Sequence, residues 1–234
     1  MKSNKKRIGI LISFFILTAI AISTQNISYL FADEVDNDNI SRSTLQSKSL
    51  TSGDYTYDIL SDGVVITNYN GNAKKLNLPS KIDGYKVTAI GQYAFNKCES
   101  IESIKIPSGV TRIGYKSFYK CYNLETIEIP NGVTSIEEYA FSECESLKSI
   151  KLPNSIIKIG EHAFWNCKSL KSAKLSNNIK KIERGTFHGC SSLEKIELPN
   201  GISEIGDSAF AFCDDLESIE IPNRDRTSSC RERV

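Results

Sequence analysis

The sequence is poor in several residue types that mark particular classes of protein. Its 234 residues include two histidines, one methionine, one tryptophan and six prolines, and the net charge is +1. This near-neutral balance argues against nucleic acid as the main partner. With 40% hydrophobic residues, the composition is also unlike that of disordered or collagen-like chains. The chain is long enough for one sizeable domain.

Motifs that hold metals or perform catalysis are missing as well. There is no C-x₂-C pair, no H-E-x-x-H, no phosphate-binding loop and no G-x-S-x-G. His162 and His188 occupy different positions of the repeat described below, and both are expected at the surface. A Cys/His nucleophile would need an exposed thiol, whereas the pattern places the nearby cysteines inside. We therefore predict that the protein is not an enzyme and has no catalytic residue, metal site or cofactor.

Only one long apolar run is present, and it lies at the N-terminus. Basic MKSNKKR precedes residues 8–22, IGILISFFILTAIAI. Because about 20 apolar residues are usually needed to cross a bilayer, residues 1–32 are predicted to be a secretory signal peptide, cleaved after Ala32. Left uncleaved, the same segment would be a membrane anchor. Residues 33–53 are polar and aperiodic, which predicts a flexible linker.

Most of the remaining chain repeats itself with a period of 23 residues. Each unit has Phe at position 6, Cys at position 9 and Leu or Ile at position 12. A period in this range is typical of a solenoid, in which each unit buries its apolar face only against its neighbours. Six units follow one another without insertion or deletion, beginning at Ile90, Ile113, Ile136, Ile159, Ile182 and Ile205.

Two local periods alternate within each unit. LETIEIP, residues 124–130, alternates apolar residues and ends at Pro, which predicts a short strand stacked in parallel on its counterparts. IGYKSFYKC, residues 113–121, favours one or two turns of helix, or a tight coil, on the other wall. The predicted fold over residues 90–223 is thus an α/β repeat solenoid that curves, with its parallel strands on the concave wall.

The repeat has a family resemblance. IGEHAFWNCKSLKSAKL, residues 159–175, and IGDSAFAFCDDLESIEIP, residues 205–222, resemble the BspA-like, Treponema-type leucine-rich repeat. The stretch before the repeats, from YTYDILSDGVVITNYNG to KVTAIG, resembles the opening hairpin and irregular first repeat of that family. The resemblance implies a secreted or surface protein of a bacterium, of the kind discussed as adhesins or host-interaction proteins.

The two ends of the solenoid differ. Asp62-Gly63 and Asn70-Gly71 are hairpin signals, so residues 54–89 are predicted to form an N-terminal capping hairpin and an irregular first repeat. After Pro222 the apolar pattern breaks, and residues 224–234, RDRTSSCRERV, are predicted to be a non-repeat tail. This tail caps the stack, or a partner covers the open end, or the chain is a fragment of a longer protein.

Seven cysteines in an exported protein invite a disulfide interpretation. Six of them, however, share one position of the repeat, and parallel side chains on adjacent turns have poor geometry for a bridge. We predict a ladder of buried thiols instead. Cys230 lies outside the pattern and is the expected free or intermolecular thiol.

Variable residues on the strand wall are the candidate binding site. Two outward columns combine into a basic centre, Lys148, Lys151, Lys171 and Lys174, beside an acidic field, Glu194, Glu197, Glu217 and Glu220. Such a banded face would orient a charged partner, although Lys and Glu also simply keep an exposed sheet soluble. On the other wall, Trp165 is a candidate anchor, since Trp is enriched at binding hot spots. No regularly spaced cluster of exposed aromatics is apparent that would indicate a glycan site.

The functional prediction is an exported bacterial binding module, secreted or on the cell surface. It would act in adhesion or host-protein interaction, with a matrix or cell-surface protein as partner, and would meet the membrane only through an uncleaved signal segment. The alternatives are a self-associating structural protein, joined through the open C-terminal end, and a truncated fragment of a longer adhesin.

Overall fold

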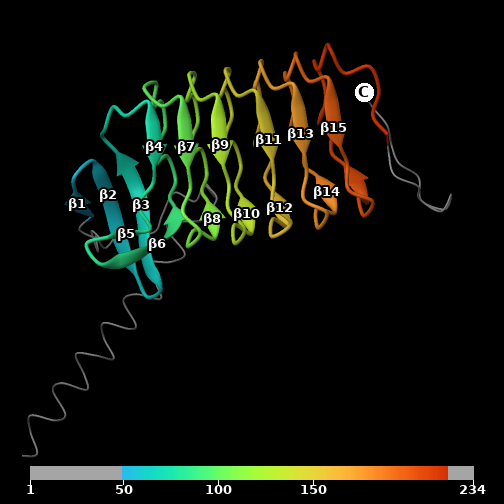
Figure 1. Cartoon of the computed structure of the whole chain (residues 1–234). Coiled ribbons are helices and arrows are strands. Elements are labelled where there is room, and N and C mark those ends of the chain that lie inside the picture. Colours follow the sequence, from blue (N-terminus) through green and yellow to red (C-terminus); the bar gives the residue numbers. More distant parts are fainter. Residues whose placement is uncertain (1–48, 221–234) are drawn as a thin grey trace, which may run out of the picture. The chain divides into compact units, whose positions relative to one another are not determined.

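The computed structural model describes residues 49–220 (Figure 1). The predicted signal peptide, most of the predicted linker, the non-repeat tail and Cys230 lie outside these residues. The part that is described forms sixteen strands, and none of it forms a helix that is long and apolar enough to cross a membrane. It is a β-solenoid whose strands stack in register at the predicted 23-residue spacing, as in the pairing of Ser149 with Ser172.

The N-terminal cap is built from antiparallel hairpins. β1 (Leu50–Ser52), β2 (Tyr55–Leu60) and β3 (Gly63–Tyr69) pair in sequence, and β5 (Lys81–Ile82) pairs with β6 (Tyr85–Ile90). The hairpin signalled by Asp62-Gly63 is present, with Ser61 and Asp62 as its turn residues and Gly63 paired with Leu60. Asn70-Gly71 is not a hairpin turn, because the chain leaves β3 there to begin the solenoid and β4 pairs with β7 instead.

Two features of the cap were not predicted. Leu50–Ser52, part of the predicted flexible linker, is strand β1 and pairs with β2. The turn between β5 and β6 is Asp83-Gly84, both with positive φ, as a two-residue hairpin of the primed type requires. The Asp83 carboxylate accepts hydrogen bonds from Ser52 at 2.7 Å and from Tyr57 at 2.6 Å, and so ties the two hairpins together.

One face of the solenoid, which we call the strand wall, carries parallel three-residue strands. The first comes from the irregular repeat before Ile90, and residues 216–220 of the sixth repeat form no strand. That this wall is concave stays a prediction. Its strands are β4 (Lys75–Asn77), β7 (Ser103–Lys105), β9 (Thr126–Glu128), β11 (Ser149–Lys151), β13 (Ser172–Lys174) and β15 (Lys195–Glu197).

A second set of parallel strands, two residues each, leads into the start of each repeat. Position 1 of the repeat, such as Ile113 or Ile136, is the more buried residue of each pair and is fully buried except at Ile205. The set continues the register of β6 and consists of β8 (Arg112–Ile113), β10 (Ser135–Ile136), β12 (Lys158–Ile159), β14 (Lys181–Ile182) and β16 (Glu204–Ile205).

The segment predicted as helix or tight coil is a run of turns, which we call the turn wall. It comprises positions 2–9 of each repeat, residues 91–98 in the first. Turn bonds join Ala94 N–H to the Gly91 carbonyl and Cys98 N–H to the Phe95 carbonyl. Positions 4 and 8 have positive φ in all six repeats, as at Tyr93 and Lys97. The α part of the predicted α/β class is therefore not found in residues 49–220.

Hydrogen bonds between repeats explain why the turn wall is not helical. At positions 4, 6 and 8 the N–H points along the stack and donates to a carbonyl of the next repeat. In the first repeat these bonds run from Tyr93 to Tyr115, from Phe95 to Ser117 and from Lys97 to Tyr119. A helix would turn the same N–H groups back onto its own carbonyls. The first five repeats all form these three bonds, and the last of them is donated by Gly189.

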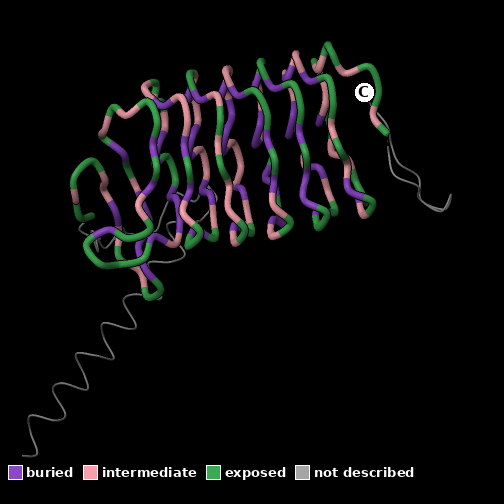
Figure 2. The backbone as a smooth tube through the Cα atoms, in the orientation of Figure 1, coloured by how far each residue is buried: buried purple, intermediate pink, exposed green. Residues whose placement is uncertain are grey.

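A column of stacked aromatic rings forms the middle of the core. The position-6 phenylalanines, from Phe95 to Phe210, stack with centroids 5.0–5.6 Å apart and nearly parallel planes. Tyr69 and then Tyr55 close the column at the cap. Figure 2 shows buried positions recurring at the same level of every repeat. Burying a Phe contributes about 1.5–3 kcal/mol, so stacking lets each repeat stabilise the next.

The predicted ladder of buried thiols is confirmed. The six cysteines at position 9 are unbridged, and four of them are fully buried. Each thiol from Cys121 onward donates to the carbonyl of the phenylalanine one repeat earlier, with Sγ···O distances of 3.0–3.2 Å. The thiols are therefore packing residues with a satisfied polar group.

Candidate functional site

The strand wall presents three outward columns, one more than the sequence analysis identified. The predicted charged columns are positions 13 and 16. Between them, position 14 forms a column of hydroxyls, Ser103, Thr126, Ser149 and Ser172, which ends at Lys195. Strand alternation in Thr126-Ile127-Glu128 would have placed this column outward, because residues on either side of a buried residue face the other way.

The predicted basic centre is brought together, but most of its charge is paired. Lys148 bonds Glu125 at 2.5 Å, Lys171 lies 3.3 Å from Glu194, and Lys174 bonds Glu197 at 2.7 Å. Each pair links adjacent repeats in one column. Lys151 differs, since it forms no ion pair with any residue of 49–220. Glu217 and Glu220 are exposed and lie beyond the last strand, so the acidic field is not one continuous surface of the sheet.

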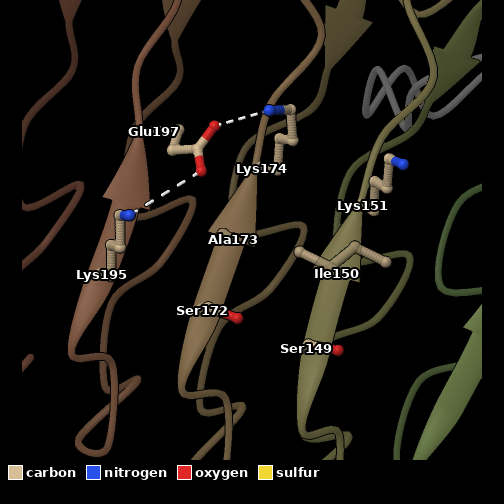
Figure 3. Close-up of a pocket in the computed structure, with 8 residues that line it drawn as sticks. All are labelled: Ser149, Ile150, Lys151, Ser172, Ala173, Lys174, Lys195 and Glu197. Carbon is tan, nitrogen blue, oxygen red and sulfur yellow. Dashed lines mark hydrogen bonds and ion pairs between the residues drawn. The ribbon is translucent and has the colours of Figure 1, made fainter.

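A hollow opens in the strand wall at β13. Position 15, whose side chain turns towards the core, is Ile in β7, β9, β11 and β15 but Ala173 in β13. The space on the outer side of the strands is about 190 Å³. Figure 3 shows Ile150 and Ala173 at the base, with the serine hydroxyls below and the lysines around them. The lining residues are Ser149, Ile150, Lys151, Ser172, Ala173, Lys174, Lys195 and Glu197.

The rim of the hollow is basic. Glu197 lies between two ammonium groups, Lys174 at 2.7 Å and Lys195 at 4.0 Å (Figure 3). The hydrogen bond from Lys174 holds the pKa of the Glu197 carboxyl below its ordinary value, so the carboxylate stays charged at neutral pH. Three lysines thus face one carboxylate, and Lys151 is the cation left for an incoming anion.

The other predicted residues lie on the turn wall, away from this hollow. Trp165 is half-buried, with its ring 6.3 Å from that of His188. His162 is not exposed as expected, because it stacks on Tyr139 at 4.9 Å and covers the side of Gly185. Within residues 49–220 no three His, Cys, Asp or Glu side chains gather where they would hold a metal ion.

Comparisons with known proteins agree with this architecture. A family model described as BspA type leucine rich repeat region (6 copies) matches residues 67–132 and 111–229. A search of curated proteins found no match. Among solved structures, the pneumococcal vaccine antigen PcpA is similar at 21% identity and a TM-score of 0.50, over 69% of this chain and 37% of that one, which concerns the fold alone.

Two solved structures are similar in sequence as well. The T. pallidum leucine-rich repeat protein TpLRR is 32% identical, with a TM-score of 0.59, over 72% of this chain and 91% of that one. A leucine-rich repeat protein from Bacteroides ovatus is 30% identical, with a TM-score of 0.57, over 74% of this chain. The match spans about half, 53%, of the Bacteroides chain. With the matched repeats covering more than half of its length, the chain belongs to the BspA-type leucine-rich repeat family.

Proposed function

We propose that the chain is an exported bacterial binding module that engages a host matrix or cell-surface protein through its strand wall. The observation that carries this proposal is the hollow over Ala173. It combines an apolar base, two hydroxyls and the Lys151 ammonium, which forms no ion pair within residues 49–220. Family membership supports a protein-interaction role, and the predicted signal peptide supports export to the medium or the cell surface.

The hollow fits a short element of a protein partner. About 190 Å³ is room for one apolar side chain over Ile150 and Ala173. An acidic residue beside that side chain would pair with Lys151, and its backbone would meet the serine hydroxyls. A buried anchor surrounded by polar contacts is the usual composition of a binding hot spot. The paired lysines and glutamates around it would set orientation more than affinity.

Filling the hollow tests this proposal. Ser172→Leu puts a larger side chain on the outer face of β13, where Ser172 is exposed, so the domain should fold. We expect binding to the recognised member of a panel of purified extracellular-matrix proteins to fall about tenfold or more, as loss of an anchor pocket predicts. Binding of the full-length chain to surface-immobilised matrix proteins gives the measurement. Ser103→Leu, the same change at position 14 of β7 and outside the hollow, is the control.

A charge substitution tests what the Lys151 ammonium contributes to binding, apart from the hollow itself. Lys151→Gln should weaken binding and reduce its salt dependence, because the unpaired ammonium is lost. Lys105→Gln removes a lysine of the same column that is paired with Glu128 at 2.9 Å, and should change little. Equal binding by Ser172→Leu and the parent chain, or no binding to any matrix protein, would contradict the proposal.

Self-association is a second candidate, favoured by the C-terminal end of the turn wall. The N–H groups of Ser208, Phe210 and Phe212 occupy the positions that donate to the next repeat, and they have no acceptor within residues 49–220. Phe212 is also 69% exposed. An end with unpaired donors and an exposed ring invites a neighbouring chain.

A further inference from the structure

The turn wall carries a group of tyrosines gathered around one lysine. The Lys116 ammonium lies 4.8 Å from the centre of the Tyr115 ring, 5.0 Å from Tyr139, 5.6 Å from Tyr119 and 5.9 Å from Tyr93. We call these five residues the tyrosine cluster. They come from three consecutive repeats. Tyr115 and Tyr119 are close to Lys116 in sequence, whereas Tyr93 and Tyr139 lie one repeat before and one repeat after it.

The repeat geometry places these side chains together. Tyr93, Lys116 and Tyr139 all occupy position 4, where φ is positive, and Tyr115 and Tyr119 come from positions 3 and 7 of the middle repeat. Tyr115 packs edge-on against Tyr93 at 5.5 Å and against Tyr139 at 6.2 Å. Edge-to-face contacts of this kind are favourable and hold the rings in fixed positions.

The cation in the cluster is held but not neutralised. Lys116 forms no ion pair with any residue of 49–220, although Lys120, one turn further on, lies 3.6 Å from Glu143. Ring faces attract an ammonium group, yet they leave its charge available. An external cation would compete with Lys116 for the same rings, so the cluster suits an anion. The fixed lysine loses little further freedom when that anion binds.

The tyrosines add surfaces that a simple anion would not use. Tyr93 is 40% exposed, and the other three rings are half-buried. Each tyrosine combines a flat apolar face with a hydroxyl. The C–H groups on one face of a pyranose ring pack against such faces, while the sugar hydroxyls bond to water and to tyrosine hydroxyls. A sugar ring that bears a carboxylate satisfies both the rings and Lys116.

The size of the cluster favours a sugar over a protein. Three adjacent repeats span roughly 10 Å along the stack. Four partly exposed tyrosines offer roughly a few hundred Å², whereas a stable protein interface buries about 800 Å² on each partner. We propose that the tyrosine cluster binds an acidic saccharide, with the carboxylate on Lys116 and the sugar ring against the exposed tyrosines. This site is separate from the hollow at Ala173 and does not depend on it.

Titration calorimetry with the full-length chain tests this proposal. The probes are oligosaccharides that contain glucuronate, galacturonate or sialic acid, with neutral cello-oligosaccharide and polyglutamate as comparisons. We expect millimolar or tighter binding of at least one acidic saccharide and weaker binding of both comparisons. Lys116→Gln should reduce the affinity roughly ten- to a hundredfold, as expected for a lost charge-assisted hydrogen bond.

Two matched control variants distinguish a loss of saccharide binding from a general effect on folding. Lys97→Gln changes an exposed lysine of the same wall that also has positive φ, at 58°, and should leave binding unchanged. Tyr93→Asn removes the exposed ring but tolerates the left-handed backbone, and should weaken binding, whereas Tyr85→Asn in the cap should not. The proposal is overturned if no acidic saccharide binds, if Lys116→Gln binds as well as the parent, or if polyglutamate binds best.

Discussion

At the residue scale, the cysteine at position 9 joins one repeat to the one before it. Its thiol is small enough for the crowded centre of the solenoid and donates to a phenylalanine carbonyl that also accepts a turn bond from a backbone N–H of its own repeat. Burial raises the pKa of Cys98 and of Cys213 to about 12, and raises the pKa of Cys144 and Cys190 well above the ordinary value. The thiols are therefore poor nucleophiles in the folded protein.

These thiols predict an alkaline loss of stability. A thiol whose pKa is higher in the folded than in the unfolded chain stabilises the fold fully below the unfolded pKa of 9.0, and this contribution is lost as pH rises towards about 12. We expect the urea midpoint to fall above pH 9. Cys144→Ala, which has one thiol fewer, should start lower and fall less steeply. A midpoint independent of pH in this window would contradict the assignment.

Single residues show which features of the structure could be predicted from the sequence. A strict period identified the buried phenylalanines and cysteines, because a repeated apolar position in a solenoid has only the core to face. The outward columns of Lys148 and Lys151 followed from the same register. The hollow at β13 was not predicted, because its size depends on how the outward side chains of neighbouring strands pack. Lys116 and its tyrosines needed the turn geometry, which no helical or strand period describes.

At the element scale, the turn segments are where the structure differs most from the sequence prediction. Positions 1, 5, 6 and 9 have spacings that also fit a helix, and the sequence alone does not tell these apart. The hydrogen bond from the position-6 N–H decides between helix and turns. In the first repeat this N–H, of Phe95, donates to the Ser117 carbonyl of the next repeat, so it cannot donate within a helix. Positive φ at positions 4 and 8 follows from alternating such bonds with turn bonds.

The fifth repeat shows how tightly the turns pack. Gly185 occupies position 4 with φ +58°, and an added Cβ would lie 2.3 Å from the His162 ring. Gly185→Ala should therefore lower the free energy of unfolding by about 1–3 kcal/mol, through backbone strain and displacement of the ring. Urea denaturation gives the value. Gly84→Ala is the control, because Gly84 has φ +87° with open space around it and should show the backbone cost alone. Equal losses would mean that His162 moves freely.

At the scale of the whole molecule, self-association through the C-terminal end of the turn wall can be measured as mass. If Phe212 and the three N–H groups without an acceptor in residues 49–220 join a second copy, the mass by light scattering should rise with concentration above the 26.0 kDa of one chain, even in reductant. Phe212→Asn keeps the left-handed backbone, at φ 59°, and should lower that mass. Tyr93→Asn at the other end is the control.

The possible results for mass separate the explanations. A constant single-chain mass would contradict self-association and leave the strand wall as the functional surface. Extra mass that reductant removes would identify an intermolecular disulfide, for which Cys230 is the predicted thiol. Extra mass that persists in reductant and in Phe212→Asn would place the contact elsewhere on the molecule.

The hydrogen bonds at positions 4, 6 and 8 also give the middle of the turn wall an electrical direction. Each peptide group has a dipole of about 3.5 D, and those at positions 4, 6 and 8 all point their N–H ends towards the sixth repeat. Other groups of the repeat, such as the N–H of Gly114 and of Glu125, donate to the preceding repeat, and their dipoles oppose those at positions 4, 6 and 8. The electrical direction is therefore local to these positions. Asp207, exposed at position 3 of the sixth repeat, lies at the end towards which their N–H groups point, where negative charge is favoured.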